Sequence, residues 1–266
     1  LMTTQGIKVY PSQGAFIQYL VLNQAVPPLN NINVREGIAA AINRTNLVDT
    51  VFAGTAAPLY SQVPNGMFSH IDAFKTAYGA GPNYTLADSL LAQAGYTQSN
   101  KLVLNLYYET TGHYPQSPDQ ALALKAELEA SGVITVNLQG VDWPTMGANR
   151  QAGNMPAFIM GWYPDFIDPY DYSYPFLQSS ASSWLNDGYN STQMDSLLNQ
   201  ALSASSANAG TLYQQIQTLQ AHDVPIVPLY QGGSNCCGAA AKTTVGGIYL
   251  DVTLIFRYST LFETAS

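Results

Sequence analysis

Residues 102–162 read LVLNLYYETTGHYPQSPDQALALKAELEASGVITVNLQGVDWPTMGANRQAGNMPAFIMGW, and this stretch decides the fold. Three short apolar segments in it predict β-strands: 102–108, 134–138 and 156–162. The segments between them predict helices, because Ser117 and Pro118 suit the start of one helix and Asp142 can cap the other. Strands alternating with helices in this order predict parallel pairing through right-handed crossovers. We therefore expect an α/β fold with a mostly parallel central sheet flanked by helices.

The flanking sequence extends this pattern on both sides. An apolar strand is expected at residues 16–23, followed by two helical segments that meet at Asn43, which can cap the second. Thr85 with an acid three residues later predicts a capping box for another helix. Two amphipathic helices follow the stretch, the second of them with Asn208 as its expected cap. The tail from about residue 232 is expected to belong to another layer.

Composition excludes several classes of protein. The 266 residues carry a net charge of −8 and have a pI of about 4.6, so no basic stripe is present to bind nucleic acid. Charged residues make up 10% of the chain, against roughly 25% in an average domain. The adjacent Cys236 and Cys237 are either unpaired thiols or a strained vicinal disulfide. Neither they nor the three histidines have the spacing of metal ligands, so no metal or cofactor is expected.

The segment GWYPDFIDPYDY, residues 161–172, follows the last strand and concentrates the candidate site. Asp165, Asp168 and Asp171 recur at intervals of three residues among prolines and aromatic rings. Carboxylates beside ring faces on a stiff loop suit a ligand with a cationic end and an apolar body. Asp165 is interpreted as a ligand contact or a turn residue, and Asp168 chiefly as a turn residue. Asp171 is assigned to solvent or to a helix cap.

Three further residues are candidates for the wall of this site. Trp162 lies either in the core or against a cleft, and Tyr163 adds a second ring. His113 follows the strand at 102–108, at the kind of strand end where open α/β sheets bind ligands. An exposed loop position remains the alternative for His113. We predict Trp162, Tyr163, Asp165, Asp168 and His113 as ligand-binding residues.

Four motifs, taken in order, resemble the extracellular solute-binding proteins of ABC importers, in the oligopeptide/dipeptide class (family 5). They are VREGIAAAINR at 34–44, ADSLLAQAGY at 87–96, IMGWYPD at 159–165 with the Asp168-Pro169 pair, and VPIVPLY at 224–230. Members of that family are about twice as long as this chain. The resemblance therefore implies that the chain is the C-terminal half of such a protein. Residues 1–30 would enter from the hinge, 31–231 would form the second lobe, and 232–266 would return toward the hinge and first lobe.

The resemblance also implies roles for residues at the site. In peptide-binding relatives, the acid three residues after the Gly-Trp pair holds the α-ammonium group of the ligand, and this position is Asp165 here. Some oligopeptide binders place an arginine where this chain has Ile159, so a fixed anchor for the peptide carboxylate is absent at that point. An oligopeptide is the expected ligand, and an oligosaccharide is the alternative. The expected partner is an ABC permease in the membrane.

The implied protein is extracellular or periplasmic, tethered to the membrane at full length, and a monomer. Catalytic signatures such as Gly-x-Ser-x-Gly and phosphate-binding glycine loops do not occur in the sequence. Asp165 with Asp168 could form a glycosidase pair, although residues three apart on one loop rarely straddle a bond. We expect no enzymatic activity. A hydrolase, and a sensor or surface-layer module that never meets a permease, remain the competing hypotheses.

Overall fold

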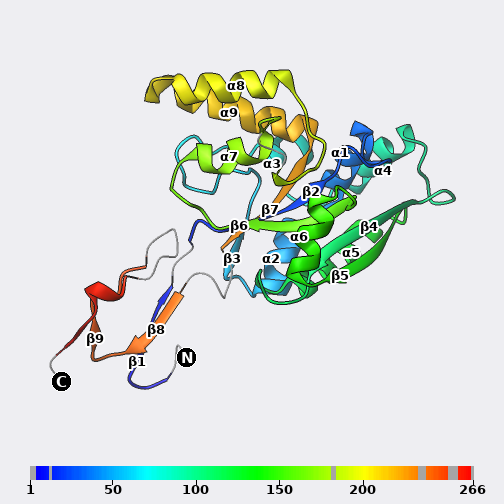
Figure 1. Cartoon of the computed structure of the whole chain (residues 1–266). Helices are drawn as coiled ribbons and strands as arrows, with labels where there is room; N and C mark the ends of the chain where they lie inside the picture. The colour runs from blue at the N-terminus through cyan, green and yellow to red at the C-terminus, as the bar shows by residue number, and fades with distance from the viewer. Residues whose placement is uncertain (1–3, 12–13, 181–183, 233–237, 251–256, 265–266) are drawn as a thin grey trace.

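A six-stranded sheet forms the centre of the protein, with the strand order β3-β7-β2-β6-β4-β5 (Figure 1). The computed structural model describes residues 4–11, 14–180, 184–232, 238–250 and 257–264. The bounds of the six strands are β2 Ile17–Leu22, β3 Ala56–Pro58, β4 Leu102–Glu109, β5 Ile134–Val141, β6 Ala157–Trp162 and β7 Ile226–Gly232. All three strands predicted within residues 102–162 are therefore present.

Pairing within this sheet is mixed. β4 runs parallel to both β5 and β6, as the strand–helix alternation predicts. β2 is antiparallel to β6 and β7, and β3 is antiparallel to β7. Hence β4, β5, β6 and β7 point one way, while β2 and β3 point the other way. The predicted α/β class is confirmed. Three of the five pairs of neighbouring strands are antiparallel, and two of these three arise because β2 separates β6 from β7. β2 is buried along its whole length.

Nine α-helices in the described residues pack around this sheet. Their bounds are α1 Ile32–Ala41, α2 Arg44–Phe52, α3 Ala73–Tyr78, α4 Tyr84–Gln93, α5 Ser117–Glu129, α6 Trp143–Gln151, α7 Pro169–Leu177, α8 Thr192–Ser203 and α9 Ser206–Asp223. Helix α5 packs on β4 and β5, α1 packs on α4, and α8 packs on α9. None of the described helices combines the length and the apolar character that crossing a membrane requires.

Two predicted helix caps are confirmed. The side chains of Asn43 and Asp142 accept hydrogen bonds from the backbone N–H three residues later, at 3.1 and 2.8 Å. Ser117 is not a cap, because α5 already includes it. The residue before it, Gln116, occupies the cap position in a left-handed conformation with φ of 53° and makes no side-chain capping bond.

The other two cap predictions are wrong. Helix α4 begins one residue before Thr85, and Asn83 caps it by accepting from the backbone N–H of Leu86 at 3.1 Å. Asn208 lies inside α9, whose cap position is Ser205. In both helices an earlier residue with a short polar side chain precedes the predicted one, and the chain enters the helix there.

A salt bridge from α5 covers part of the free edge of β5. Lys125 Nζ and Glu129 Oε1 are 2.6 Å apart, one helical turn from each other. The same ammonium donates to the carbonyl of Val136 at 2.6 Å, and the carboxylate accepts from the backbone N–H of Val136 at 2.8 Å. The hydrogen bonds and the ion pair lower the pKa of Glu129. The outward backbone groups of one edge residue are thus paired within the chain.

The two ends of the chain form an arm that projects from the lobe (Figure 1). Strand β1 Ile7–Pro11 pairs antiparallel with β8 Gly238–Lys242, and β9 Val245–Gly246 pairs with β10 Phe262–Glu263. Neither pair joins the six-stranded sheet. Cys236 and Cys237 lie outside the described residues.

A buried acid, Asp187, lies in the loop that precedes α8. The side chain of Asp187 is fully buried, and Oδ1 accepts from the backbone N–H of Tyr189 at 3.1 Å. Oδ2 has no hydrogen-bond partner among the described residues. Burial raises the pKa of Asp187 to about 7, because the charged carboxylate loses its hydration.

The caps give a paired stability test. We expect Asn83→Ala to lower the free energy of unfolding by about 1 kcal/mol, because α4 loses the acceptor for one of its first N–H groups. Asn208→Ala is the matched control, and should leave stability unchanged or slightly raised, since Asn208 is exposed inside a helix. Urea unfolding followed by circular dichroism measures both. A larger loss for Asn208→Ala would contradict the assignment.

Asp187 predicts a dependence of stability on pH. Because its folded pKa is raised, the folded state holds a proton that the unfolded chain releases, so stability should fall as pH rises from about 4 to about 7. We expect Asp187→Asn to remove this part of the pH dependence. Urea unfolding across pH 4 to 8 tests this expectation. Asp119→Asn, at an exposed position, is the control, and its free energy of unfolding should depend on pH as in the wild type. Equal slopes for the wild type and Asp187→Asn would refute the assignment.

Candidate functional site

The carboxyl ends of β4, β5 and β6 meet at one edge of the sheet, because the three strands are parallel neighbours. Each strand is followed there by a segment rich in aromatic residues: His113 and Tyr114 after β4, Trp143 after β5, and Tyr163 after β6. In open α/β sheets this edge is the usual place for a ligand. We therefore take this edge of the sheet as the candidate site, and its use by a ligand stays a prediction.

Glu109, the last residue of β4, fixes the first of these segments. Its side chain is fully buried and accepts hydrogen bonds from the backbone N–H of Thr111 at 2.7 Å and of Tyr114 at 2.9 Å. A buried carboxylate needs such donors to offset its lost hydration. The loop is held back against the strand end, and it carries His113 at its exposed tip.

His113 stacks on Trp143, which joins the ends of β4 and β5. The two ring centroids are 3.8 Å apart and the planes are inclined by 12°. Partial burial lowers the pKa of His113, and the negative charge of Glu109 opposes this shift. The stacked rings of His113 and Trp143 thus form a flat aromatic surface. The predicted role of His113 in ligand binding stays a prediction.

Gly161 allows the rings of the site to approach β6. The hydroxyl of Tyr114 donates to the carbonyl oxygen of Gly161 at 3.0 Å. A Cβ atom at Gly161 would lie 2.8 Å from the ring of Phe16 and 2.9 Å from the ring of Tyr114. Tyr163 then stacks on Phe16, with centroids 4.3 Å apart. The result is a packed wall of rings from which Tyr163 remains 38% exposed.

Asp171 is the buried anchor of the loop that follows β6. Its Oδ2 atom accepts from the indole N–H of Trp162 at 2.9 Å and from the backbone N–H of Asp165 at 3.2 Å. Burial raises the pKa of this carboxyl, and the two hydrogen bonds partly offset the shift. The prediction that Asp171 is solvated or caps a helix is wrong, because its side chain is 2% exposed in the first turn of α7.

Trp162 is half-buried, and its indole N–H is directed at the buried carboxylate of Asp171. Besides Asp171, its ring contacts Phe176 and Trp184 edge-on, with centroids 5.0 and 5.7 Å away. The core interpretation of Trp162 therefore has direct support from these contacts. Its use as a cleft wall stays a prediction.

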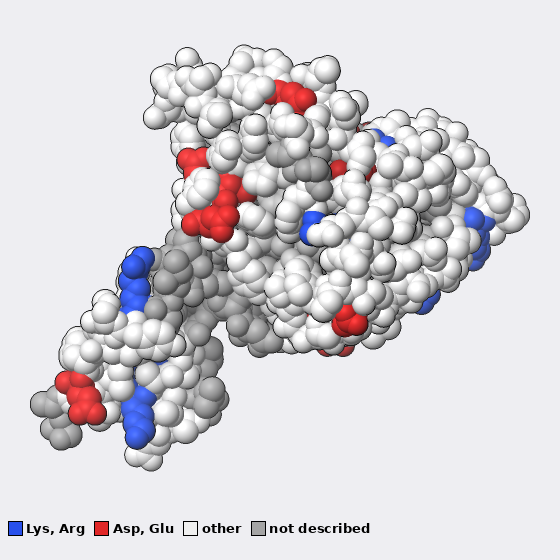
Figure 2. All heavy atoms as spheres, viewed as in Figure 1, with Lys and Arg blue, Asp and Glu red and all other residues white. Residues whose placement is uncertain are grey.

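The remaining two acids of the segment behave differently from each other. The side chain of Asp165 is exposed and makes no hydrogen bond or ion pair within the described residues. Asp168 caps α7, because its Oδ1 atom accepts from the backbone N–H of Tyr170 at 2.8 Å. The turn interpretation thus holds for Asp168 and not for Asp165. Figure 2 shows acidic side chains gathered around the loop that leads from β6 into α7.

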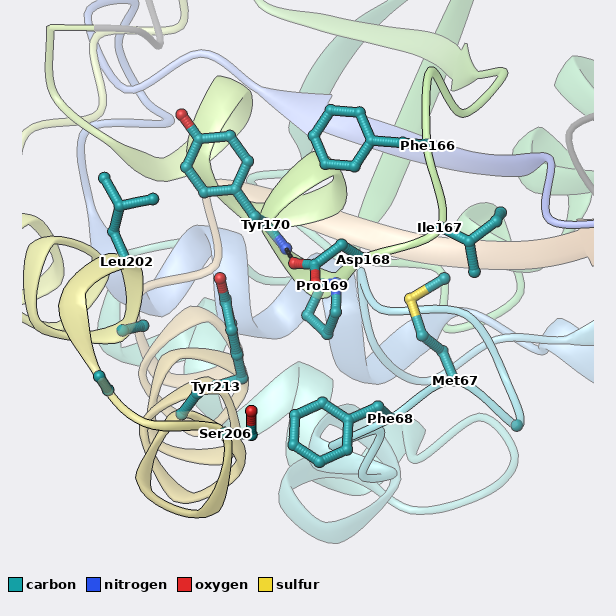
Figure 3. Close-up of a pocket in the computed structure, with 14 residues that line it drawn as sticks. Met67, Phe68, Phe166, Ile167, Asp168, Pro169, Tyr170, Leu202, Ser206 and Tyr213 are labelled. Carbon is teal, nitrogen blue, oxygen red and sulfur yellow. Dashed lines mark hydrogen bonds between the residues drawn. The ribbon is translucent and has the colours of Figure 1, made fainter.

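A groove of about 780 Å³ lies beside this loop (Figure 3). Its lining comes from three places in the sequence: the loop at 66–68, residues 166–170 around the start of α7, and residues 201–213 at the junction of α8 and α9. This groove was not predicted from the sequence. Trp143 was not predicted as a site residue either, although its position after β5 places it beside His113.

The profile described as "Bacterial extracellular solute-binding proteins, family 5 Middle" matches residues 1–184. The chain belongs to this family. Among curated relatives, the periplasmic oligopeptide-binding protein OppA of Escherichia coli is 26% identical over 219 residues, which cover 80% of this chain and 39% of the relative. Heme-binding protein A of Haemophilus influenzae is 24% identical, over 86% of this chain and 42% of the relative.

Solved structures show the same fold. The dipeptide binding protein from Pseudoalteromonas sp. SM9913, in complex with Met-Leu, superposes with a TM-score of 0.83 at 21% identity, over 99% of this chain and 51% of that protein. The periplasmic binding protein DppA from Helicobacter pylori, in complex with the peptide STSA, superposes with a TM-score of 0.83 at 24% identity. The match covers 100% of this chain and 50% of that protein. The chain thus spans 39–51% of the length of these four proteins.

The anchor role of Asp171 is testable. We expect Asp171→Leu to lower the free energy of unfolding by about 1–3 kcal/mol, because the indole of Trp162 and the backbone N–H of Asp165 lose their acceptor. Asp49→Leu is the matched control at an exposed helical position, with an expected change within about 0.5 kcal/mol. Urea unfolding measures both variants. Equal, small changes would show that Asp171 does not hold the loop.

Proposed function

We propose that this chain is the second lobe of an extracellular solute-binding protein that captures oligopeptides for an ABC importer. The observation that carries the proposal is the carboxylate of Asp165. It is exposed at the carboxyl end of β6, has no partner among the described residues, and sits on a loop whose backbone Asp171 fixes. A charged group that is positioned but unpaired is available for an opposite charge from a ligand.

The ammonium group of a peptide has the charge and the donors that Asp165 requires. In water the pair would contribute little, because both ions are well hydrated. Closure of a second lobe over the site would exclude water and strengthen the attraction, provided that the remaining hydrogen-bond capacity of both groups is satisfied. We therefore propose hinge closure around the ligand as the mechanism.

Aromatic surfaces next to Asp165 suit the apolar part of such a ligand. Tyr163 is the most exposed ring of the wall, and the stacked pair of His113 and Trp143 continues it across the ends of β4 and β5. Rings of this kind bind side chains without fixing one sequence. We assign Trp162 a supporting role at the base of this wall.

The names of the relatives favour a peptide over an oligosaccharide. They include the oligopeptide-binding protein OppA and the probable D,D-dipeptide-binding periplasmic protein DdpA of Escherichia coli. Both structural neighbours described above contain bound peptides. The family consists of binding proteins, and we propose no reaction at this site.

The division of the chain follows from the same proposal. Residues 1–30 and 232–266 would connect the lobe, 31–231, to a hinge and a first lobe, although β2 itself lies in the central sheet. The complete protein would act as a monomer outside the cytoplasm, tethered to the membrane, and would deliver its ligand to a permease.

Asp165→Asn tests the proposal in the protein with both lobes. We expect the affinity for a free tripeptide to fall at least about tenfold, because the amide keeps the shape of the carboxylate but not its charge. Isothermal titration calorimetry measures the affinity. Unchanged peptide affinity in Asp165→Asn would refute the role of Asp165.

Acetylation of the peptide provides the matched control. An N-acetylated tripeptide has no ammonium group, so we expect it to bind the wild type weakly and to be insensitive to Asp165→Asn. Asp119→Asn, at an exposed position in the first turn of α5, should leave the affinity for the free tripeptide unchanged. If a sugar binds the wild type and the tripeptide does not, the oligosaccharide alternative replaces the proposal.

A further inference from the structure

Four large apolar side chains are exposed together in the groove beside α7. Phe68, Phe166, Ile167 and Leu202 are 57%, 47%, 46% and 60% exposed, and all of them line this groove. They come from three separate loops or helix ends, which the fold brings together (Figure 3). Clustered exposed apolar residues mark a contact surface more often than scattered ones do.

The floor of the groove carries a polar group without a partner. Tyr213, in α9, is 5% exposed, and its hydroxyl makes no hydrogen bond within the described residues. In Figure 3 this hydroxyl points into the groove, toward the side on which Asp168 lies. Burial raises the pKa of Tyr213 to about 12, and the negative charge of Asp168 contributes to the shift. Tyr213 and Asp168 both line the groove.

Asp168 gives the groove its charge. Only its Oδ1 atom is used to cap α7, so Oδ2 remains available. No Lys or Arg is among the described residues that line the groove. The neighbouring Asp165 adds to the negative potential. The ring of Phe166 stacks on the ring of Tyr170, with centroids 6.2 Å apart. A cation here would meet a carboxylate and the faces of aromatic rings.

We propose that this groove docks a protein segment in which a Lys or Arg side chain is flanked by large apolar residues. The basic group would lie between Asp168 and the Tyr213 hydroxyl, and the apolar neighbours would cover Phe68, Phe166 and Leu202. The proposal concerns a surface outside the strand-end site, and it holds whatever ligand that site binds.

The shape and charge of the groove favour a protein segment as the occupant. Small-molecule sites enclose most of their ligand, whereas here the apolar residues at the rim stay about half exposed. A basic or aromatic anchor in a pocket surrounded by apolar contacts is typical of protein interfaces. A second copy of this chain is disfavoured, because each copy carries a net charge of −8.

Blocked peptides test the charge preference without using the ammonium group that Asp165 is proposed to hold. The probes are acetyl-Leu-Arg-Phe-amide and its Gln and Glu counterparts, titrated into the chain labelled with carbon-13 at its methionine methyl groups. Met67 lines the groove, and its signal is assigned through Met67→Leu. We expect the Arg probe to shift this signal and to bind at least about fivefold more tightly than the Gln probe, and the Glu probe to bind least.

Three variants locate the binding. Asp168→Asn keeps an oxygen to cap α7 but removes the charge, and Tyr213→Phe removes only the hydroxyl. Each substitution should lower the affinity for the Arg probe at least about threefold. Leu202→Lys, at an exposed position of α8, should abolish the preference for Arg. Tyr213→Phe and Leu202→Lys should leave the binding of free peptides to the strand-end site unchanged.

Several outcomes would overturn the proposal. Equal affinities for the three probes, or no shift of the Met67 signal, would show that the groove does not select a basic segment. A loss of Arg-probe binding in Asp165→Asn but not in Asp168→Asn would place the probe at the other site. If free phenethylamine binds the groove as tightly as the Arg probe, the occupant is a small amine. Concentration-dependent dimerisation lost in Leu202→Lys would make it a second copy.

Discussion

A carboxylate removed from water requires hydrogen-bond donors, and Asp171 obtains two of them from the segment that ends β6. The indole N–H of Trp162 and the backbone N–H of Asp165 both point at one of its oxygens. This arrangement ties the last residue of a buried strand, the following loop and the first turn of α7 to a single point. The exposed acid at 165 and the groove beside α7 both depend on this fixed backbone.

Much of the fold was predictable from local sequence alone. The three strands in residues 102–162 and the helices between them follow from apolar periodicity, and their parallel order follows from the alternation. Asn43 and Asp142 were identified as caps because short polar side chains precede helical patterns there. The strand-end positions of His113 and Asp165 followed from the same topology.

Other features depend on contacts between distant residues, which periodicity does not reveal. The antiparallel insertion of β2 between β6 and β7 pairs a strand near the N-terminus with two strands more than 130 positions later. Asp171 looked like a surface acid because its partners are not evident in a spacing of three residues. The groove combines residues from 66–68 with residues from 166–170 and 201–213. The cap of α4 was wrongly predicted at Thr85 for a simpler reason, since Asn83, another residue with a short polar side chain, lies two positions earlier.

The ion pair of Lys125 and Glu129 has a consequence for how the protein behaves in crowded solution. An edge strand with free backbone groups can add a strand from another molecule and seed aggregation. Here both outward groups of Val136 are already occupied by the two charged side chains. A foreign strand would have to displace a charged pair and leave the ammonium and the carboxylate to find new partners. The edge of β5 is thereby protected from intermolecular sheet growth near its N-terminal end.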